Sequence, residues 1–272
     1  MGTTMTTLHH RRLDNQQMES LIVDSRSEDV VLSDDHRRSL SARFRAVVSN
    51  EHRRLDAWSV EKAGVIANDF RWSPVTSRRT LGNAALRRIA RASTSSVVDA
   101  VSHEVNDQLL RAVSGYARSG SMAQWLAQSP QPVIGLVVAE AVNWATQLRE
   151  ITERFNQPWC IAPNDAYYDV PSARTTLRAR RDVIISSDAG RIVMRVRSGT
   201  PGKSAGPGLR ADLTMETLAD SNGVAPLRFI GLWPEAGVCL AVDGTMADLR
   251  AGARDLVRTA VVRQRHQTRH AA

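Results

Sequence analysis

One acidic and two basic side chains lie at spacings that suit phosphate chemistry. Asp182 precedes the apolar run 183–185, and Arg195 and Arg197 come after the turn-forming segment 186–190. Both flanks of that segment have the β-branched composition of short strands, so the sequence predicts a β-hairpin. Alternate residues of a strand point to one side, which places Arg195 and Arg197 on the same face. Their guanidinium groups match phosphate oxygens, and Asp182 can form an ion pair with one of them.

Two further acids could complete a metal site with Asp182. Asp212 and Glu216 are four residues apart in the predicted helix 209–218, so they share one helix face. Carboxylates are the ligands that Mg²⁺ prefers, and these two are the candidates for a carboxylate that has migrated onto the helix. The alternative is that they form a solvent-exposed acidic face.

The arginines also have a simpler explanation as surface residues. Arg191, Arg195 and Arg197 alternate with apolar residues, which is the pattern of any strand with one face in the core and one face in water. On that interpretation they line the solvated face of the strand and have no binding role.

These residues need a sheet with helices to position them, and the sequence predicts one in the second half of the chain. Residues 1–33 are polar, lack clear periodicity and are interpreted as a disordered arm. Residues 34–155 form a helical region, 156–265 an α/β core and 266–272 a short tail. Helices are predicted at 84–92, 97–113, 133–155, 209–218 and 247–264, and strands at 175–185, 191–196, 227–232 and 238–242. The fold class is therefore α/β or α+β, with a helical N-terminal half followed by a small mixed sheet flanked by helices.

The composition narrows the function classes. Lys62 and Lys203 are the only lysines among 36 basic residues, and the formal net charge is +8. A positive charge favours a polyanionic partner such as nucleic acid. The longest apolar stretch, 133–139, is far shorter than the roughly 20 residues of a membrane span. Cys160 and Cys239 lack metal-ligand spacing, so we expect buried free thiols and no zinc site. Because the chain also has a polar N-terminus without an apolar signal segment, we expect no membrane partner and a cytoplasmic protein.

The order of elements and the residues on them resemble one nuclease superfamily. From residue 159 to about residue 265 the chain is similar to the RecB-like branch of the PD-(D/E)XK nucleases, which is common in actinobacteria. Segment 179–182 (Ala-Arg-Arg-Asp) lies where that branch has a Gly-Arg-x-Asp-like segment, and segment 195–199 (Arg-Val-Arg-Ser-Gly) lies where it has Asp-x-Lys-Thr-Gly. Helix 211–218 corresponds to the helix that brings a Gln or Tyr toward the site, and His103 to a histidine that approaches the metal. The resemblance implies a restriction-endonuclease-like core.

The resemblance also implies a lost activity, because the chain departs from the family at its catalytic positions. In such nucleases two carboxylates hold Mg²⁺ and a lysine assists the nucleophile, whereas here Arg195 and Arg197 replace the second acid and the lysine. A guanidinium about 4 Å from a divalent ion is repelled by several kcal/mol even at an effective dielectric constant of about 20. The expectation is a catalytically degenerate protein without a cofactor, whose Arg180, Arg195 and Arg197 bind phosphate. It would bind DNA or act as a structural partner in DNA repair, recombination or defence.

Two other functions stay open. A Mg²⁺-dependent DNA nuclease would remain if Glu216 or Asp212 supplied the second carboxylate beside Asp182. A DNA-binding transcriptional regulator would use residues 84–113, where a Ser-rich turn between two predicted helices resembles a helix-turn-helix. The alternative for that turn is that residues 93–96 only cap the second helix, since Ser and Thr are good N-caps.

Overall fold

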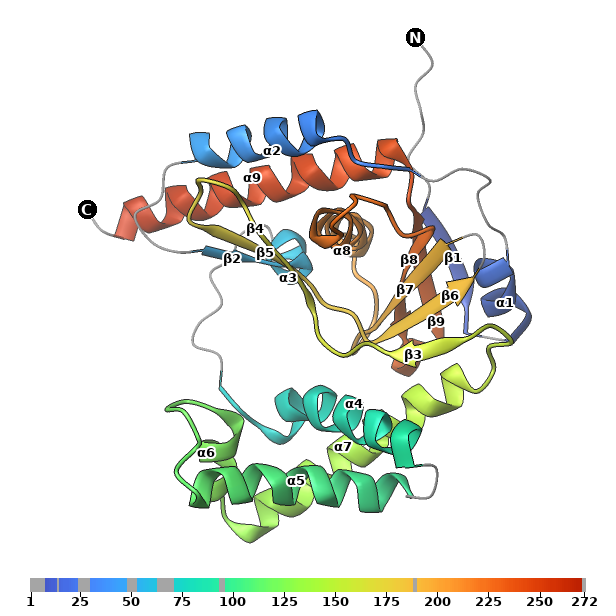
Figure 1. Ribbon diagram of the computed structural model, residues 1–272, viewed down its shortest axis with the longest axis vertical. Helices are drawn as coiled ribbons and strands as arrows, with labels where there is room; N and C mark the ends of the chain where they lie inside the picture. Colours follow the sequence, from blue (N-terminus) through green and yellow to red (C-terminus); the bar gives the residue numbers. More distant parts are fainter. Residues whose placement is uncertain are drawn as a thin grey trace. The chain divides into compact units, whose positions relative to one another are not determined.

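The structure is a computed structural model that describes residues 8–13, 15–23, 30–47, 53–62, 71–92, 96–187 and 190–270. It is a mixed α/β protein, as the sequence predicts (Figure 1). The chain divides into an α/β unit formed by residues 1–66 and 156–272 and a helical unit formed by residues 67–155. In this division the helical unit begins at residue 67, whereas the predicted helical region begins at residue 34.

The α/β unit is built on a six-stranded sheet with the order β1-β9-β8-β7-β6-β3. The strands are β1 (Leu8–Arg12), β3 (Trp159–Ile161), β6 (Val183–Ser187), β7 (Gly190–Val196), β8 (Arg228–Trp233) and β9 (Val238–Asp243). Strands β7 and β8 are parallel, and all other neighbours are antiparallel. A parallel pair needs a crossover connection, which helix α8 (Ala205–Ala219) supplies. Every residue of β8 is buried, as expected of a central strand that is covered on both faces.

A second sheet has three strands in the order β2-β5-β4. It contains β2 (Arg53–Leu55), β4 (Ala166–Asp169) and β5 (Thr175–Ala179). The predicted single strand 175–185 is therefore two strands in two sheets, β5 and β6, and residues 180–182 form the junction between them. At the end of this junction Asp182 already bonds to the six-stranded sheet, because its amide donates to the carbonyl of Met194 at 2.8 Å and its carbonyl accepts from the amide of Ala162 at 2.8 Å. The change of partner strands takes place over the two residues before it.

Helix α8 forms the centre of the α/β unit (Figure 1). It contacts both sheets, the short helix α3 (Ala57–Glu61) and the long helix α9 (Met246–His270). Leu213 of α8 joins Phe229 of β8 and Leu256 of α9 in one apolar core. Helices α8 and α9 approach most closely at Gly252, where a Cβ atom would lie 2.2 Å from the carbonyl oxygen of Arg210. Glycine is therefore required where the two helices meet.

The prediction of a disordered arm over residues 1–33 is wrong for the parts of it that the structure describes. Strand β1 pairs with β9 in antiparallel register, and helix α1 (Asn15–Val23) buries Met18, Leu21 and Ile22. A polar segment can form an edge strand, because the pairing uses backbone groups while outward side chains stay in water.

Helix α2 (Asp34–Ala46) packs alongside α9 (Figure 1). It begins after Ser33, whose hydroxyl accepts a hydrogen bond from the amide of His36 and so satisfies one of the free amides at the helix start. Leu40 and Phe44 bury the inner face of α2 in the core of the α/β unit.

The helical unit contains α4 (Pro74–Ala92), α5 (Val97–Val113), α6 (Met122–Gln128) and α7 (Gln131–Thr152). Its core includes Leu81 and Val137. Helix α5 begins after Ser96, whose hydroxyl accepts a hydrogen bond from the amide of Asp99. Ser96 is therefore a cap, as the second interpretation of this turn predicts, and residues 93–95 lie outside the described residues.

The two cysteines are free thiols, as the sequence predicts. Cys239 is buried, but Cys160 is exposed at the edge of the sheet on β3, so the expectation of burial is wrong for Cys160. No helix in the described part of the chain has the length and apolar character that crossing a membrane requires.

Candidate functional site

Asp182 is buried in the α/β unit, at the junction between β5 and β6, and none of its surface is exposed. Its Oδ2 atom accepts a hydrogen bond from the amide of Val196 on β7 at 2.8 Å. The carboxylate is therefore held beside the strand that carries Arg195 and ends just before Arg197.

Arg195 forms an ion pair with Asp212 in the interior of the unit. Its Nη1 atom donates to Oδ2 of Asp212 at 2.6 Å. Arg195 is 7% exposed and Asp212 is 0% exposed, so both charges have been taken out of water. Removing charges from water is costly unless they are paired, and this pair supplies the compensation.

Burial and the neighbouring charges shift the pKa values of Arg195 and Asp212 in opposite directions. Burial alone would lower the pKa of Arg195, but the carboxylate of Asp212 and, more weakly, those of Glu61 and Asp182 raise it above its ordinary value. Burial raises the pKa of Asp212 to about 6, although the guanidinium groups of Arg195 and Arg197 act in the opposite direction. At neutral pH both partners are therefore charged.

The pair corrects two expectations from the sequence. Arg195 does not line a solvated face of its strand, and Asp212 and Glu216 do not form an exposed acidic face of their helix, since all three are buried. The reason is the position of α8, which packs against β8 and β9, against the second sheet and against α9, and whose Asp212 reaches Arg195 of the adjacent strand β7.

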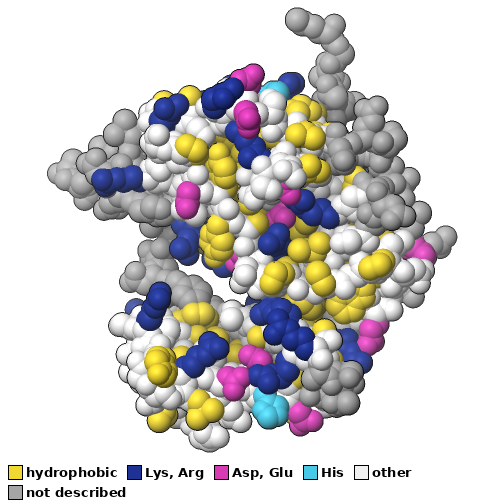
Figure 2. All heavy atoms as spheres, in the orientation of Figure 1, with side chains coloured by type: hydrophobic (Ala, Val, Ile, Leu, Met, Phe, Trp, Pro, Cys, Tyr) yellow, Lys and Arg dark blue, Asp and Glu magenta, His cyan; other side chains and the backbone are white. Residues whose placement is uncertain are grey.

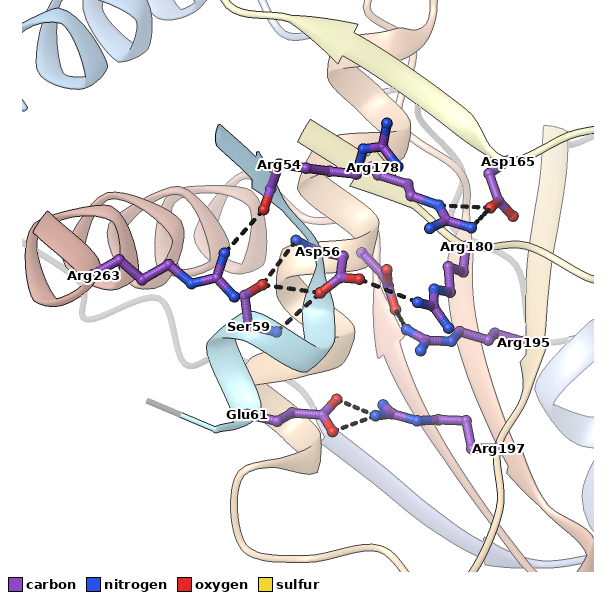
Figure 3. A network of polar contacts seen from close by, with 11 residues as sticks. Arg54, Asp56, Ser59, Glu61, Asp165, Arg178, Arg180, Arg195, Arg197 and Arg263 are labelled. Atoms are coloured by element: carbon purple, nitrogen blue, oxygen red, sulfur yellow. Dashed lines mark hydrogen bonds and ion pairs between the residues drawn. The ribbon is translucent and has the colours of Figure 1, made fainter. Parts of the chain in front are cut away.

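Arg197, the first residue after β7, is bound by Glu61 of α3 (Figure 3). Its Nη2 atom donates to both carboxylate oxygens of Glu61. The guanidinium also lies 5.0 Å from the centre of the Trp233 ring, within the range of a cation–π contact. The Glu61 carboxylate offers this guanidinium the same pair of acceptor oxygens that a phosphate would offer.

Arg180 reaches the same short helix. Its Nη2 atom lies 3.5 Å from Oδ2 of Asp56, which is the N-cap residue of α3 (Figure 3). Asp56 also accepts a hydrogen bond from the amide of Ser59 at 3.0 Å. Burial opposes ionisation of Asp56, but Arg180 and the Ser59 hydrogen bond outweigh it and lower the pKa of this carboxyl.

Two acids of this network, the N-cap residue Asp56 and Glu61 of α3, are not among the site residues that the sequence predicts. Asp56 and Ser59 have the spacing of a capping box, which is a signal for the start of a helix. That signal does not identify the arginines to which Asp56 and Glu61 bind, because these lie more than a hundred residues further along the chain.

Glu216, one turn beyond Asp212 on α8, belongs to a second group of ion pairs. Its Oε1 atom accepts from Nη1 of Arg181 at 2.8 Å and lies 3.8 Å from Nε of Arg191. Arg191 also pairs with Asp220 at 2.7 Å. Burial raises the pKa of Glu216, while the two arginines act against it. This carboxylate is thus directed to Arg181 and Arg191.

The structure brings Asp182, Arg195 and Asp212 together and connects Arg180 and Arg197 to them through α3. The ion-pair network consists of Arg180–Asp56, Arg195–Asp212 and Arg197–Glu61, and the pairs of Glu216 form a separate group. The network is formed by the α/β unit alone. His103 is exposed on α5 of the helical unit.

The side chains at this position do not fit the Mg²⁺ ion that the resemblance implies for an active site. Oδ2 of Asp182 accepts the amide of Val196, and Oδ2 of Asp212 accepts Arg195. Within the described ranges, no three His, Cys, Asp or Glu side chains converge in the way that metal ligands do. A guanidinium next to the two acids supplies the positive charge that a cation would otherwise bring.

Comparison with known proteins found no family model and no curated protein that matches the chain.

Proposed function

We propose that this protein binds nucleic acid without cleaving it. In this proposal the α/β unit is a PD-(D/E)XK-like core of the RecB-like kind, and ion pairs have replaced its metal site. The observation that carries the proposal is the buried pair of Arg195 and Asp212 beside Asp182. A metal-dependent nuclease needs carboxylates whose charge is available to a cation, and here a permanent cation of the protein itself uses that charge.

The order of elements supports the nuclease-like part of the proposal. The hairpin β6–β7 is followed by α8, by β8 parallel to β7, by β9 antiparallel to β8 and finally by α9. This is the sequence of hairpin, helix, two strands and helix on which the resemblance is based. Arg180, Asp182, Arg195 and Arg197 occupy the positions in it that the resemblance assigns to the site.

The ion pairs also determine where a nucleic acid can bind. Phosphate could reach Arg195 only if the pair with Asp212 opened, and breaking a buried pair costs about 3–5 kcal/mol. The guanidinium groups of Arg180 and Arg197 are likewise engaged by Asp56 and Glu61. These charges are therefore compensated within the fold, and the net charge of +8 must act through arginines on the surface. We place this binding in the cytoplasm, where thiols such as Cys160 stay reduced.

The absence of cleavage can be tested with purified full-length protein and labelled single- and double-stranded DNA. We expect no cleavage with Mg²⁺ or Mn²⁺ above the level of an EDTA control. Metal-dependent cleavage that disappears in Asp182→Ala would overturn the proposal and revive the migrated-carboxylate nuclease, in which case Asp212→Asn and Glu216→Gln would identify the second ligand.

Binding can be measured separately, by fluorescence anisotropy of a labelled DNA between 25 and 200 mM salt (roughly the range over which phosphate contacts lose most of their affinity). We expect binding that weakens steeply with salt. A protein that fails to bind DNA or RNA at the lowest salt would refute the proposed function, whatever the outcome of the cleavage assay.

A further inference from the structure

The long C-terminal helix carries arginines that the ion-pair network does not use. Arg250, Arg254, Arg258 and Arg265 are exposed on α9. At 3.6 residues per turn these four positions fall within an arc of about 80°, and they extend over about 22 Å of helix. The first three of these positions are about 6 Å apart along the helix axis, since four residues rise by that distance.

The α9 stripe, defined by these four arginines, keeps its charge available to a partner. Within the described part of the chain, no carboxylate lies within 4.0 Å of any of the four guanidinium groups. The nearest acid in sequence is Asp255, which is half-buried and whose pKa burial raises, with Arg210, Arg254 and Arg258 acting against that shift. This contrasts with Arg195, which has an acidic partner at hydrogen-bonding distance.

Helix α2 extends the basic surface. It lies alongside α9, and its last turn carries Arg43 and Arg45, both exposed. In Figure 2, Lys and Arg side chains, with Asp and Glu side chains among them, lie over the region that α2 and α9 occupy in Figure 1. Both helices thus carry exposed basic side chains on the surface of the α/β unit.

We propose that the α9 stripe is the surface on which the protein holds double-stranded nucleic acid, through the phosphate backbone and independently of base sequence. This inference rests on the proposed function and gives it a location. A row of guanidinium groups complements the row of phosphates along a strand, and such contacts supply most of non-specific affinity.

Two features of α9 favour a duplex over other polyanions. The helix contains no Phe, Tyr or Trp, so it offers no platform on which the bases of a single strand could stack. Its apolar residues, among them Leu249, Leu256 and Ala260, are buried in the core of the α/β unit. An anionic membrane surface is bound by helices whose apolar face is free to insert, and α9 has no such face.

The test uses the full chain, a labelled 20-base-pair duplex and the double variant Arg254→Gln/Arg258→Gln. Its matched control is Arg111→Gln/Arg118→Gln, which removes the same charge from exposed arginines of the helical unit. Four phosphate contacts give a slope of log K against log salt of about −3 to −4, and each lost contact reduces that slope by about 1. We expect the α9 variant to bind at least tenfold more weakly near 100 mM salt and the control to bind almost as well as the wild type.

The outcomes separate this inference from the proposed function. If the wild type binds no nucleic acid, the proposed function itself is wrong. If the wild type binds but the α9 variant and the control lose equal affinity, the binding surface is elsewhere and only this inference is overturned. Tighter binding of a single strand than of the duplex, or competition by vesicles of anionic phospholipid at equal charge, would also overturn it. Circular dichroism and melting curves check that each variant is folded, as expected for substitutions of exposed side chains.

Discussion

Removing Asp212 alone should destabilise the protein more than removing both partners of its ion pair. Asp212→Ala leaves Arg195 buried at 7% exposure without its carboxylate. An uncompensated buried charge costs about 3–5 kcal/mol. We expect the lower half of that range, since Asp182 and Glu61 also attract the guanidinium.

Arg195→Met should have a similar effect through the other partner. Asp212 is then buried without its arginine, and it escapes part of the cost by taking up a proton, as its pKa of about 6 already indicates. We expect a loss of about 3 kcal/mol at pH 7. The double variant contains neither charge, so its loss should be below about 2 kcal/mol, and the coupling energy of the cycle should be about 4 kcal/mol or more.

The assay is urea unfolding of the four proteins at pH 7, followed by circular dichroism and tryptophan fluorescence. The decisive quantity is the difference between the loss in the double variant and the sum of the losses in the single variants. If the sum of the losses of the two single variants equals the loss of the double variant to within about 0.5 kcal/mol, the two side chains do not interact. That result would remove the basis for a network in place of a metal site.

Three further predictions concern the Asp212 carboxyl, Gly252 and the two cysteines. Folding raises the pKa of the Asp212 carboxyl to about 6, so this group stabilises the fold at low pH and loses that contribution as the pH rises through about 6. Between pH 7 and pH 5 the free energy of unfolding of the wild type, measured with urea, should therefore increase by about 1 kcal/mol relative to that of Asp212→Asn. Parallel pH profiles of the two proteins would contradict this. Gly252→Ala should lower the free energy of unfolding by about 1–3 kcal/mol, because its methyl group would overlap a backbone carbonyl of α8. The control Gly135→Ala on α7, where the space is open, should be neutral or stabilising. Equal melting temperatures of the two variants would refute the close approach of α8 and α9. In the folded protein iodoacetamide should modify Cys160 and leave Cys239 unmodified, and mass spectrometry of the peptides would show the reverse if the burial of the two thiols were wrong.

Local patterns were sufficient to predict several elements. The periodicity of 97–113 predicts α5 with the bounds that the structure shows, and strands β8 and β9 lie within a residue of their predicted positions. The 3.6-residue spacing of apolar residues indicates a helix for α5, whereas β8 and β9 are short apolar runs on either side of a turn, which is typical of buried strands.

The partners within the network were beyond the reach of local patterns. An acid on a helix has the same sequence signature whether water or another element covers it, so Asp212 and Glu216 were open to either interpretation. Glu61 lies on a helix of five residues, too short to show periodicity, and its partner Arg197 lies 136 residues further along the chain. The break between β5 and β6 at 180–182 was not predicted for a related reason. In the sequence the two strands form one β-branched run, and only their pairing with different strands separates them.

The insertion of the helical unit has a consequence for the synthesis of the chain. Asp56 and Glu61 leave the ribosome more than a hundred residues before the arginines that bind them, and residues 67–155 are made in between. The inserted helices are therefore synthesised before Asp56 and Glu61 can meet their arginines. The segment that contains these two acids can take its final place only when α8 and β7 have left the ribosome. Contacts between such distant segments slow folding, so the α/β unit should be the last part of this protein to form.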